Sequence, residues 1–185
     1  MKTILIFSVL LSFAGYLSGQ EVKIPENYQL DKSEDYAAYK DSIVMVANWM
    51  INTPLNQEIL TRASANKFVL RWITGAPDTH IEIKPEFTSD ILKDKTNTYV
   101  QDLLMNYIAG MTLAKIEDDN ADEVTTQAAG VNAMLNGYKS IRSEYKNKFL
   151  DKLIKLDKKG ELSSWVKENN IKYDEKDKTK IVPNN

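Results

Sequence analysis

The chain has 185 residues, of which 43% are hydrophobic, and its formal net charge is −2. A chain of this size can bury a core large enough for one domain, and because it contains no cysteine that domain depends on packing alone. The small excess of acidic residues argues against binding of nucleic acid through a general basic field. We therefore expect no nucleic-acid partner.

The first twenty residues have the layout of a secretory signal peptide. Lys2 supplies a positive charge, residues 4–17 are mostly apolar, and Ser18-Gly19-Gln20 ends the run with small or polar residues. The apolar run is shorter than the roughly 20 residues that span a bilayer, so we expect cleavage, after Gly19 or Gln20, rather than a membrane anchor. Residues 1–20 are thus expected to direct export to the periplasm or the extracellular space, and the mature chain to contain no transmembrane span.

Helical periodicity dominates the chain after a short extended lead-in at residues 21–30. Apolar residues recur at intervals of three and four, which places them on one face of each helix. The short connections between these helices predict antiparallel hairpins, and hence a mainly α single domain of five to six helices over residues 31–169. Residues 170–185 are polar and are expected to form a C-terminal tail. The expected helices cover residues 31–52, 55–74, 98–117, 121–145, 147–158 and 161–169.

Local signals refine two of these helices. Asp31 and Glu34 have the spacing of a capping box, in which the two side chains accept hydrogen bonds from amides at a helix start. Residues 68–73 are apolar on almost every side, so we expect them to be the most buried segment of the fold.

A stripe of small residues marks a close helix contact. Ala129, Ala133 and Gly137 recur every four positions, which places them on one side of a helix. Such a stripe lets a neighbouring backbone approach closely, and we expect Gly110 and Ala114 of the preceding helix to meet it.

Residues 79–84 alternate between apolar and polar side chains, which predicts a short extended segment with the pattern of a strand. A lone strand leaves its backbone groups unpaired. Residues 22–24 or 181–182 could pair with it, and an extended strap over the helices is the alternative. At most one short helical turn is expected over residues 85–94.

Five residues are candidates for ligand binding: Asn48, Trp49, Trp72, His80 and Tyr107. Aromatic residues on an apolar stripe usually belong to the core, but a buried tyrosine hydroxyl or indole needs a polar partner. Asparagines within helices are either such partners or the polar points of a pocket. His80 is the only histidine, and it stands two residues from a carboxylate on the polar side of its segment, where proton transfer is one role and incidental exposure the other.

Sequence motifs for catalysis, cofactors and metals are missing. There is no Gly-x-Ser-x-Gly, no glycine-rich phosphate loop and no His-Glu-x-x-His, so we expect no cofactor. The acidic run at residues 117–123 begins like a calcium loop, but Glu123 stands where glycine is required and Ala129 where glutamate is required. We interpret this run as a capped helix start, and we expect no metal site.

Three short strings resemble a known group of proteins. They are the leader end at Ser18-Gly19-Gln20, the junction from Asn48-Trp49 to Thr53-Pro54-Leu55-Asn56, and the exit Trp72-Ile73-Thr74-Gly75-Ala76-Pro77. Together they resemble small exported helical proteins of Bacteroidetes type to which no activity is attached. The resemblance implies bacterial export and a helical fold, and it carries over no catalytic or binding residue.

The sequence favours a non-catalytic binding or protein-interaction module of the bacterial envelope or secretome, with an unknown protein or small molecule as its ligand. A hydrolase built on carboxylates is the first alternative, because paired acids leave no short motif. A structural protein associated with the envelope is the second.

Overall fold

The computed structural model describes residues 22–95 and 97–170 of the chain. Within these ranges all the regular elements are helices, which confirms the expected mainly α class. The expected signal peptide and nearly all of the expected C-terminal tail lie outside the described residues. The helices are α1 (Ser33–Ala38), α2 (Lys40–Asn52), α3 (Ile59–Gly75), α4 (Pro85–Leu92), α5 (Val100–Glu117), α6 (Glu123–Ile141) and α7 (Lys148–Lys159), and residues 162–170 are also helical.

The helices are more numerous than the five to six that were expected. The first expected helix is interrupted at Tyr39, which separates α1 from α2. The short turn expected after Lys84 is a helix of eight residues, with Pro85 at its first position, where proline is favoured. The expected capping box is also wrong, because the carboxylate of Asp35 rather than that of Glu34 accepts the amides of Asp31 and Lys32, at 3.0 and 2.9 Å.

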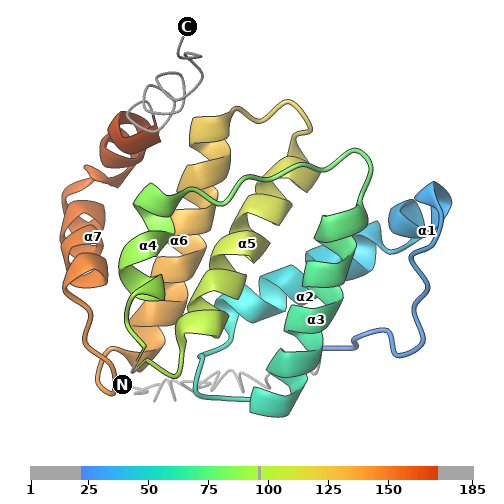
Figure 1. Cartoon of the computed structure of the whole chain (residues 1–185), viewed down its shortest axis with the longest axis horizontal. Helices are drawn as coiled ribbons and strands as arrows, with labels where there is room; N and C mark the ends of the chain where they lie inside the picture. The colour runs from blue at the N-terminus through green and yellow to red at the C-terminus, as the bar shows by residue number, and fades with distance from the viewer. Residues whose placement is uncertain (1–21, 96, 171–185) are drawn as a thin grey trace, which may run out of the picture.

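The centre of the molecule is the antiparallel hairpin of α5 and α6 (Figure 1). The strap formed by residues 76–84 crosses one face of this hairpin, and α4 lies on the same face. On the opposite face α2 passes behind α5, and α3 lies beside them (Figure 1). Buried apolar side chains from α2 to α7 and from residues 162–170 form one continuous core. The two faces of the hairpin are therefore covered by different elements.

The small residues of α5 and α6 explain how closely these helices pack. A Cβ atom on Gly110 would lie 2.5 Å from the carbonyl oxygen of Ala129 and 2.7 Å from the Cβ of Ala133. No side chain fits at those distances, so glycine is required for this approach. The expected meeting of Gly110 with the small-residue stripe of α6 is confirmed.

Not all of the segment 68–73 is buried. Phe68, Val69 and Trp72 lie in the core, as expected, but Leu70 is 46% exposed. The expectation of burial on every side is wrong because α3 packs by one face only, and its opposite face meets solvent.

A buried arginine stabilises the turn between α2 and α3. The guanidinium of Arg62 donates to the carbonyl oxygens of Met50 at 3.1 Å and Thr53 at 2.7 Å, and thereby satisfies acceptors at the C-terminal end of α2. The guanidinium carbon, Cζ of Arg62, lies 5.4 Å from the ring centroid of Trp49. Burial lowers the pKa of Arg62, and the nearby carboxylate of Asp102 opposes that change.

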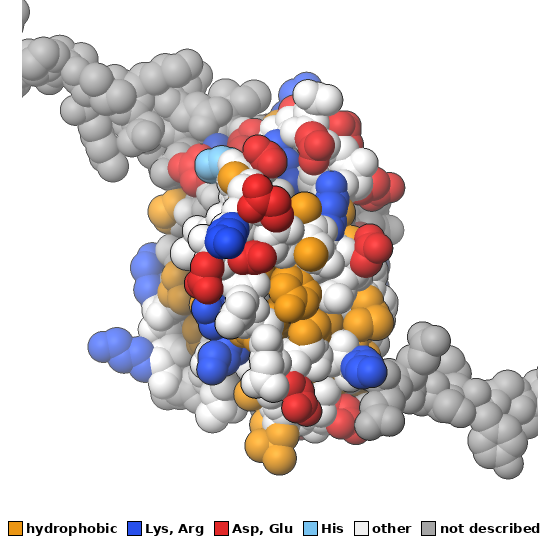
Figure 2. All heavy atoms as spheres, turned by 90° about the vertical axis from the view of Figure 1, so that its right-hand side faces the viewer, with side chains coloured by type: hydrophobic (Ala, Val, Ile, Leu, Met, Phe, Trp, Pro, Cys, Tyr) orange, Lys and Arg blue, Asp and Glu red, His pale blue; other side chains and the backbone are white. Residues whose placement is uncertain are grey.

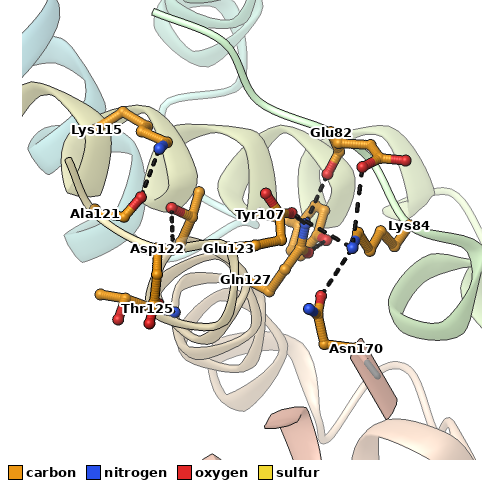
Figure 3. A network of polar contacts seen from close by, with 11 residues as sticks. Glu82, Lys84, Tyr107, Lys115, Ala121, Asp122, Glu123, Thr125, Gln127 and Asn170 are labelled. Atoms are coloured by element: carbon orange, nitrogen blue, oxygen red, sulfur yellow. Dashed lines mark hydrogen bonds and ion pairs between the residues drawn. The ribbon is translucent and has the colours of Figure 1, made fainter. Parts of the chain in front are cut away.

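Residues 79–84 form no strand, and the pairing partners considered for them are not needed. The segment is the strap that was the alternative expectation, and side chains hold it against α5 and α6 (Figure 3). The side-chain amide of Gln127 on α6 donates to the carbonyl oxygen of Glu82 at 2.8 Å. The ammonium of Lys84, only 1% exposed, donates to Asn170 at 2.9 Å. Polar side chains thus supply the contacts that a neighbouring strand would have supplied.

Candidate functional site

The five residues predicted to bind a ligand do not meet at one place. Trp72 is a core residue whose indole donates to the carbonyl oxygen of Tyr36 at 2.9 Å. Tyr107 is fully buried, its hydroxyl is hydrogen-bonded to Gln127, and burial raises its pKa. Trp49 is half-buried beside the guanidinium of Arg62. These three aromatic side chains have the partners that a structural role requires.

The other two predicted residues lie at the surface. His80 is exposed, and it borders a hollow of about 330 Å³ between the strap and the C-terminal part of α3. This hollow is mostly apolar and includes the exposed side chains of Leu70 and Ile83. Figure 2 shows, on the side of the molecule that carries α1 and α3, apolar side chains exposed between charged ones. Asn48 is exposed on α2, and its amide donates to the carbonyl oxygen of Val44 at 2.8 Å.

A larger depression, of about 540 Å³, lies on the hairpin face that α2 covers only in part. We call it the α5–α6 groove. Its floor consists of Gly110, Ala114, Ala129 and Ala133, its walls include Ile51 of α2 and Leu113 of α5, and its polar edges are Glu117, Asp118, Asn132 and Asn136. Small side chains line the floor because the close approach of α5 and α6 excludes larger ones.

A second hollow continues this groove along α2. It has a volume of about 270 Å³, and it shares Leu113 and Glu117 with the α5–α6 groove. Asn48 and Val44 form its α2 side. Of the five predicted residues, Asn48 is therefore the one that lies beside the groove. Sequence reasoning considered Asn132, with other asparagines within helices, as a polar point of a pocket. It missed the remaining groove residues because it assigned small residues to helix packing alone, although Asn132 and Asn136 follow the same stripe at the same four-residue spacing.

The acidic end of the groove lies where carboxylates are least favourable for the helix. Glu117 is the last residue of α5 and Asp118 is its C-cap, at the negative end of the helix dipole. The nearby ammonium of Lys115 donates to the carbonyl oxygen of Ala121 at 2.6 Å. Asp118 accepts the amide of Asn120 at 2.9 Å. Both acidic residues are exposed, so this end of the groove presents negative charge to an incoming ligand.

The start of α6, beside the groove, is capped as the acidic run predicted. Asp122 accepts the amide of Thr125 at 2.7 Å, and this hydrogen bond is the main cause of the lowered pKa of Asp122. Within the part of the chain that the structure describes, no group of three or more histidine or acidic side chains could hold a metal ion. Of the acids in the run, Asp122 caps α6, and Glu117 and Asp118 border the groove.

The two acids of the groove do not form the facing pair that a carboxylate hydrolase uses. They are consecutive in sequence and lie on one edge, whereas a carboxylate hydrolase places its two acids on opposite sides of the scissile bond. The remaining polar groups of the groove are the amides of Asn132 and Asn136 and the hydroxyl of Thr125. This arrangement defines an apolar binding groove with polar edges and one anionic end.

No protein-family model matches the chain, no curated protein matches its sequence, and no solved structure matches its fold. Among the described residues, no helix is both long enough and apolar enough to cross a membrane. The described residues form a helical domain whose surface carries the α5–α6 groove and smaller hollows.

Proposed function

We propose that the protein is a non-catalytic binding module, and that the α5–α6 groove receives an amphipathic helix of a partner protein. The observation that carries this proposal is the groove itself: about 540 Å³ of space with an apolar floor and an anionic end. Partner helices commonly bind in this way, with an apolar face laid into a hydrophobic groove.

The shape of the floor favours a helix as the ligand. Because Gly110, Ala114, Ala129 and Ala133 carry at most one methyl group, the backbone of a bound helix can approach α5 and α6 closely. Asn132 and Asn136 lie one helical turn apart and can donate to or accept from polar groups at the edge of that helix. From Thr125 to Asn136 the groove follows α6 for about 16 Å, which is the length of roughly three turns of a helix.

The charge of the groove selects the kind of helix. Glu117 and Asp118 give one end of the groove an uncompensated negative charge, so a lysine or arginine at the matching end of the partner gains affinity and fixes its direction. Glu117 lies at a position where it opposes the dipole of α5. A residue that costs stability in this way is expected when it serves binding.

The proposal also places the protein outside the cytoplasm. The first twenty residues support export to the periplasm or the extracellular space, and the resemblance to exported helical proteins agrees with it. Intact-mass measurement of the protein recovered from its host is expected to give a chain that begins after Gly19 or Gln20. A mass that still includes Met1-Lys2 would contradict export by cleavage.

A designed peptide tests the groove directly. The probe is a fluorescently labelled amphipathic helix of about 18 residues, long enough to be partly helical in isolation, with a leucine and alanine stripe and two lysines at one end. Fluorescence anisotropy is expected to show saturable binding of this peptide. A peptide of the same composition with a scrambled stripe, and one with glutamates in place of the two lysines, are expected to bind at least about tenfold more weakly.

Two groove variants and one control complete the test. Ala114→Leu fills the floor, and Asn136→Trp covers the groove from an exposed position that leaves the core untouched, so each is expected to weaken binding about tenfold or more. The control, Gln101→Trp, changes an exposed residue near the other end of α5. Equal binding by the wild type and Asn136→Trp, or equal binding of the ordered and scrambled peptides, would overturn the proposal.

A further inference from the structure

The outer face of α7 carries a row of lysines. Leu150, Leu153 and Ile154 are buried against the core and define the inner face of this helix. At 3.6 residues per turn, the lysines lie within about 60° of arc on the opposite side. They are all exposed, and Figure 1 shows α7 at the left edge of the molecule, packed beside α6. We call these residues the lysine ridge: Lys148, Lys152, Lys155 and Lys159.

The acids of α7 do not neutralise this ridge. Asp151 accepts the guanidinium of Arg142 at 2.7 Å, and this contact holds the pKa of that carboxyl below its usual value. Asp157 accepts the ammonium of Lys139 at 3.0 Å. Both aspartates thus pair with cations of α6 or its C-cap.

The ridge therefore keeps its charge. Within the described residues no carboxylate lies at ion-pair distance from Lys148, Lys152 or Lys155, and Lys159 has only a long contact of 3.9 Å with Glu161. The result is a row of uncompensated positive charge, about 16 Å long, on a protein whose overall charge is negative.

We propose that the lysine ridge docks the protein onto an anionic lipid surface. A row of flexible ammonium groups along one straight helix matches a flat array of lipid phosphates, and clusters of four or more lysines on an amphipathic helix are typical of such binding. No aromatic side chain lies on the ridge face, where binding of single-stranded nucleic acid would require stacking platforms. The aromatic residue of α7, Phe149, instead packs against Trp165, with ring centroids 6.0 Å apart.

Docking through the ridge leaves the proposed binding groove free. No residue of α7 lines the α5–α6 groove, so the two surfaces can be occupied together. The inference does not depend on the groove, because a lipid surface would bind the ridge whether or not the groove has a partner.

Vesicle sedimentation tests the ridge with a matched control. The purified protein is mixed at low salt with vesicles of equal parts phosphatidylglycerol and phosphatidylcholine, or of phosphatidylcholine alone. We expect binding only to the anionic vesicles, and a steep loss of binding as salt is added. The triple variant Lys148→Gln, Lys152→Gln, Lys155→Gln is expected to lower partitioning on the order of 100-fold, because each lysine is expected to contribute about fivefold.

The control variant removes the same charge elsewhere. Lys23→Gln, Lys40→Gln and Lys67→Gln change three exposed lysines outside α7, and together they are expected to lower partitioning less than about tenfold. All six substitutions affect exposed side chains, so unchanged circular dichroism is expected for both variants.

Three results would overturn the proposal. The first is equal partitioning into both kinds of vesicle. The second is an equal loss for the ridge and control variants, which would show dependence on net charge alone. The third is binding of a labelled oligonucleotide through the ridge without binding to anionic vesicles, which would assign the ridge to nucleic acid. Failure of the peptide experiment leaves this test unaffected, since the ridge and the groove are separate surfaces.

Discussion

The two faces of the α5–α6 hairpin differ in how their polar groups are satisfied. On the face covered by the strap, Lys84, Tyr107 and Gln127 are buried, and each has a hydrogen-bond or ion-pair partner within the fold (Figure 3). On the opposite face, Asn132 and Asn136 are exposed along an apolar groove that α2 covers only in part. A covered face must pair its polar groups internally, whereas an open face keeps them for a ligand. The comparison is the reason that we propose the open face as the binding surface.

The covered face gives the largest expected effect. Tyr107→Ala removes a fully buried ring and is expected to lower the free energy of unfolding by about 4 kcal/mol. Tyr107→Phe keeps the ring and leaves the Gln127 side chain without this hydrogen bond, so it is expected to cost only about 1–2 kcal/mol. Urea unfolding of both variants measures the difference. Equal losses would show that the ring itself contributes little packing.

The contact between the two helices gives the next effect. Gly110→Ala places a methyl group 2.5 Å from the carbonyl oxygen of Ala129, so α5 and α6 must move apart, at an expected cost of about 2 kcal/mol. Gly160→Ala is the control, since its Cβ would meet nothing within 4 Å, and its expected cost of about 1 kcal/mol comes from the left-handed φ of 73° alone. Thermal unfolding that ranks these variants in the reverse order would contradict the close packing of the hairpin.

The open face is expected to gain stability when its charge is removed. Glu117→Gln relieves an unfavourable charge at the C-terminal end of α5, and we expect the free energy of unfolding to rise by about 0.5 kcal/mol at low salt. The same variant is expected to bind the lysine-ended peptide about threefold more weakly. Lower stability of Glu117→Gln together with unchanged peptide binding would contradict a role of Glu117 in ligand binding.

The smallest expected effect concerns the acid that caps α6 beside the groove. The pKa of Asp122 is lowered in the folded protein, chiefly by the amide of Thr125, so folding favours the carboxylate. Its contribution to stability is therefore present above the ordinary pKa of 3.8 and is lost as the pH falls through the lower folded value. Asp122→Asn keeps a side-chain acceptor for the cap but does not titrate, so the wild type is expected to lose melting temperature relative to the variant as the pH falls below 3.8. Identical pH profiles for both proteins would contradict this role.

Sequence periodicity predicted most of the fold because it records which side of each helix meets the core. It located the start of α7, where Asn147 accepts an amide as N-cap, and the Gly110 contact, and it placed the start of α6 two residues before Glu123. It left open whether residues 79–84 form a strand or a strap, because an alternating pattern has the same appearance whether the partner is a strand or a set of side chains such as Gln127. Partners distant in sequence decide that outcome.

The candidate site was harder to predict than the fold for a related reason. Small residues such as Ala129 indicate close packing, and although the sequence placed the end of α2 correctly at Asn52, it contains no signal for how α2 lies across the hairpin. The groove lies beside Ile51, where α2 leaves part of the hairpin uncovered. Asn48 was predicted to bind a ligand because it is an asparagine within a helix, and this pattern alone does not locate the groove.

The central claim is that the open face of the hairpin binds a helix, and amide chemical-shift mapping tests it most directly. Titration of the isotope-labelled protein with the lysine-ended peptide is expected to shift the amide resonances of Gly110, Ala129 and Asn132, and to leave those near His80 unchanged. Shifts confined to the hollow beside His80, or no saturable shifts at the groove, would contradict the account.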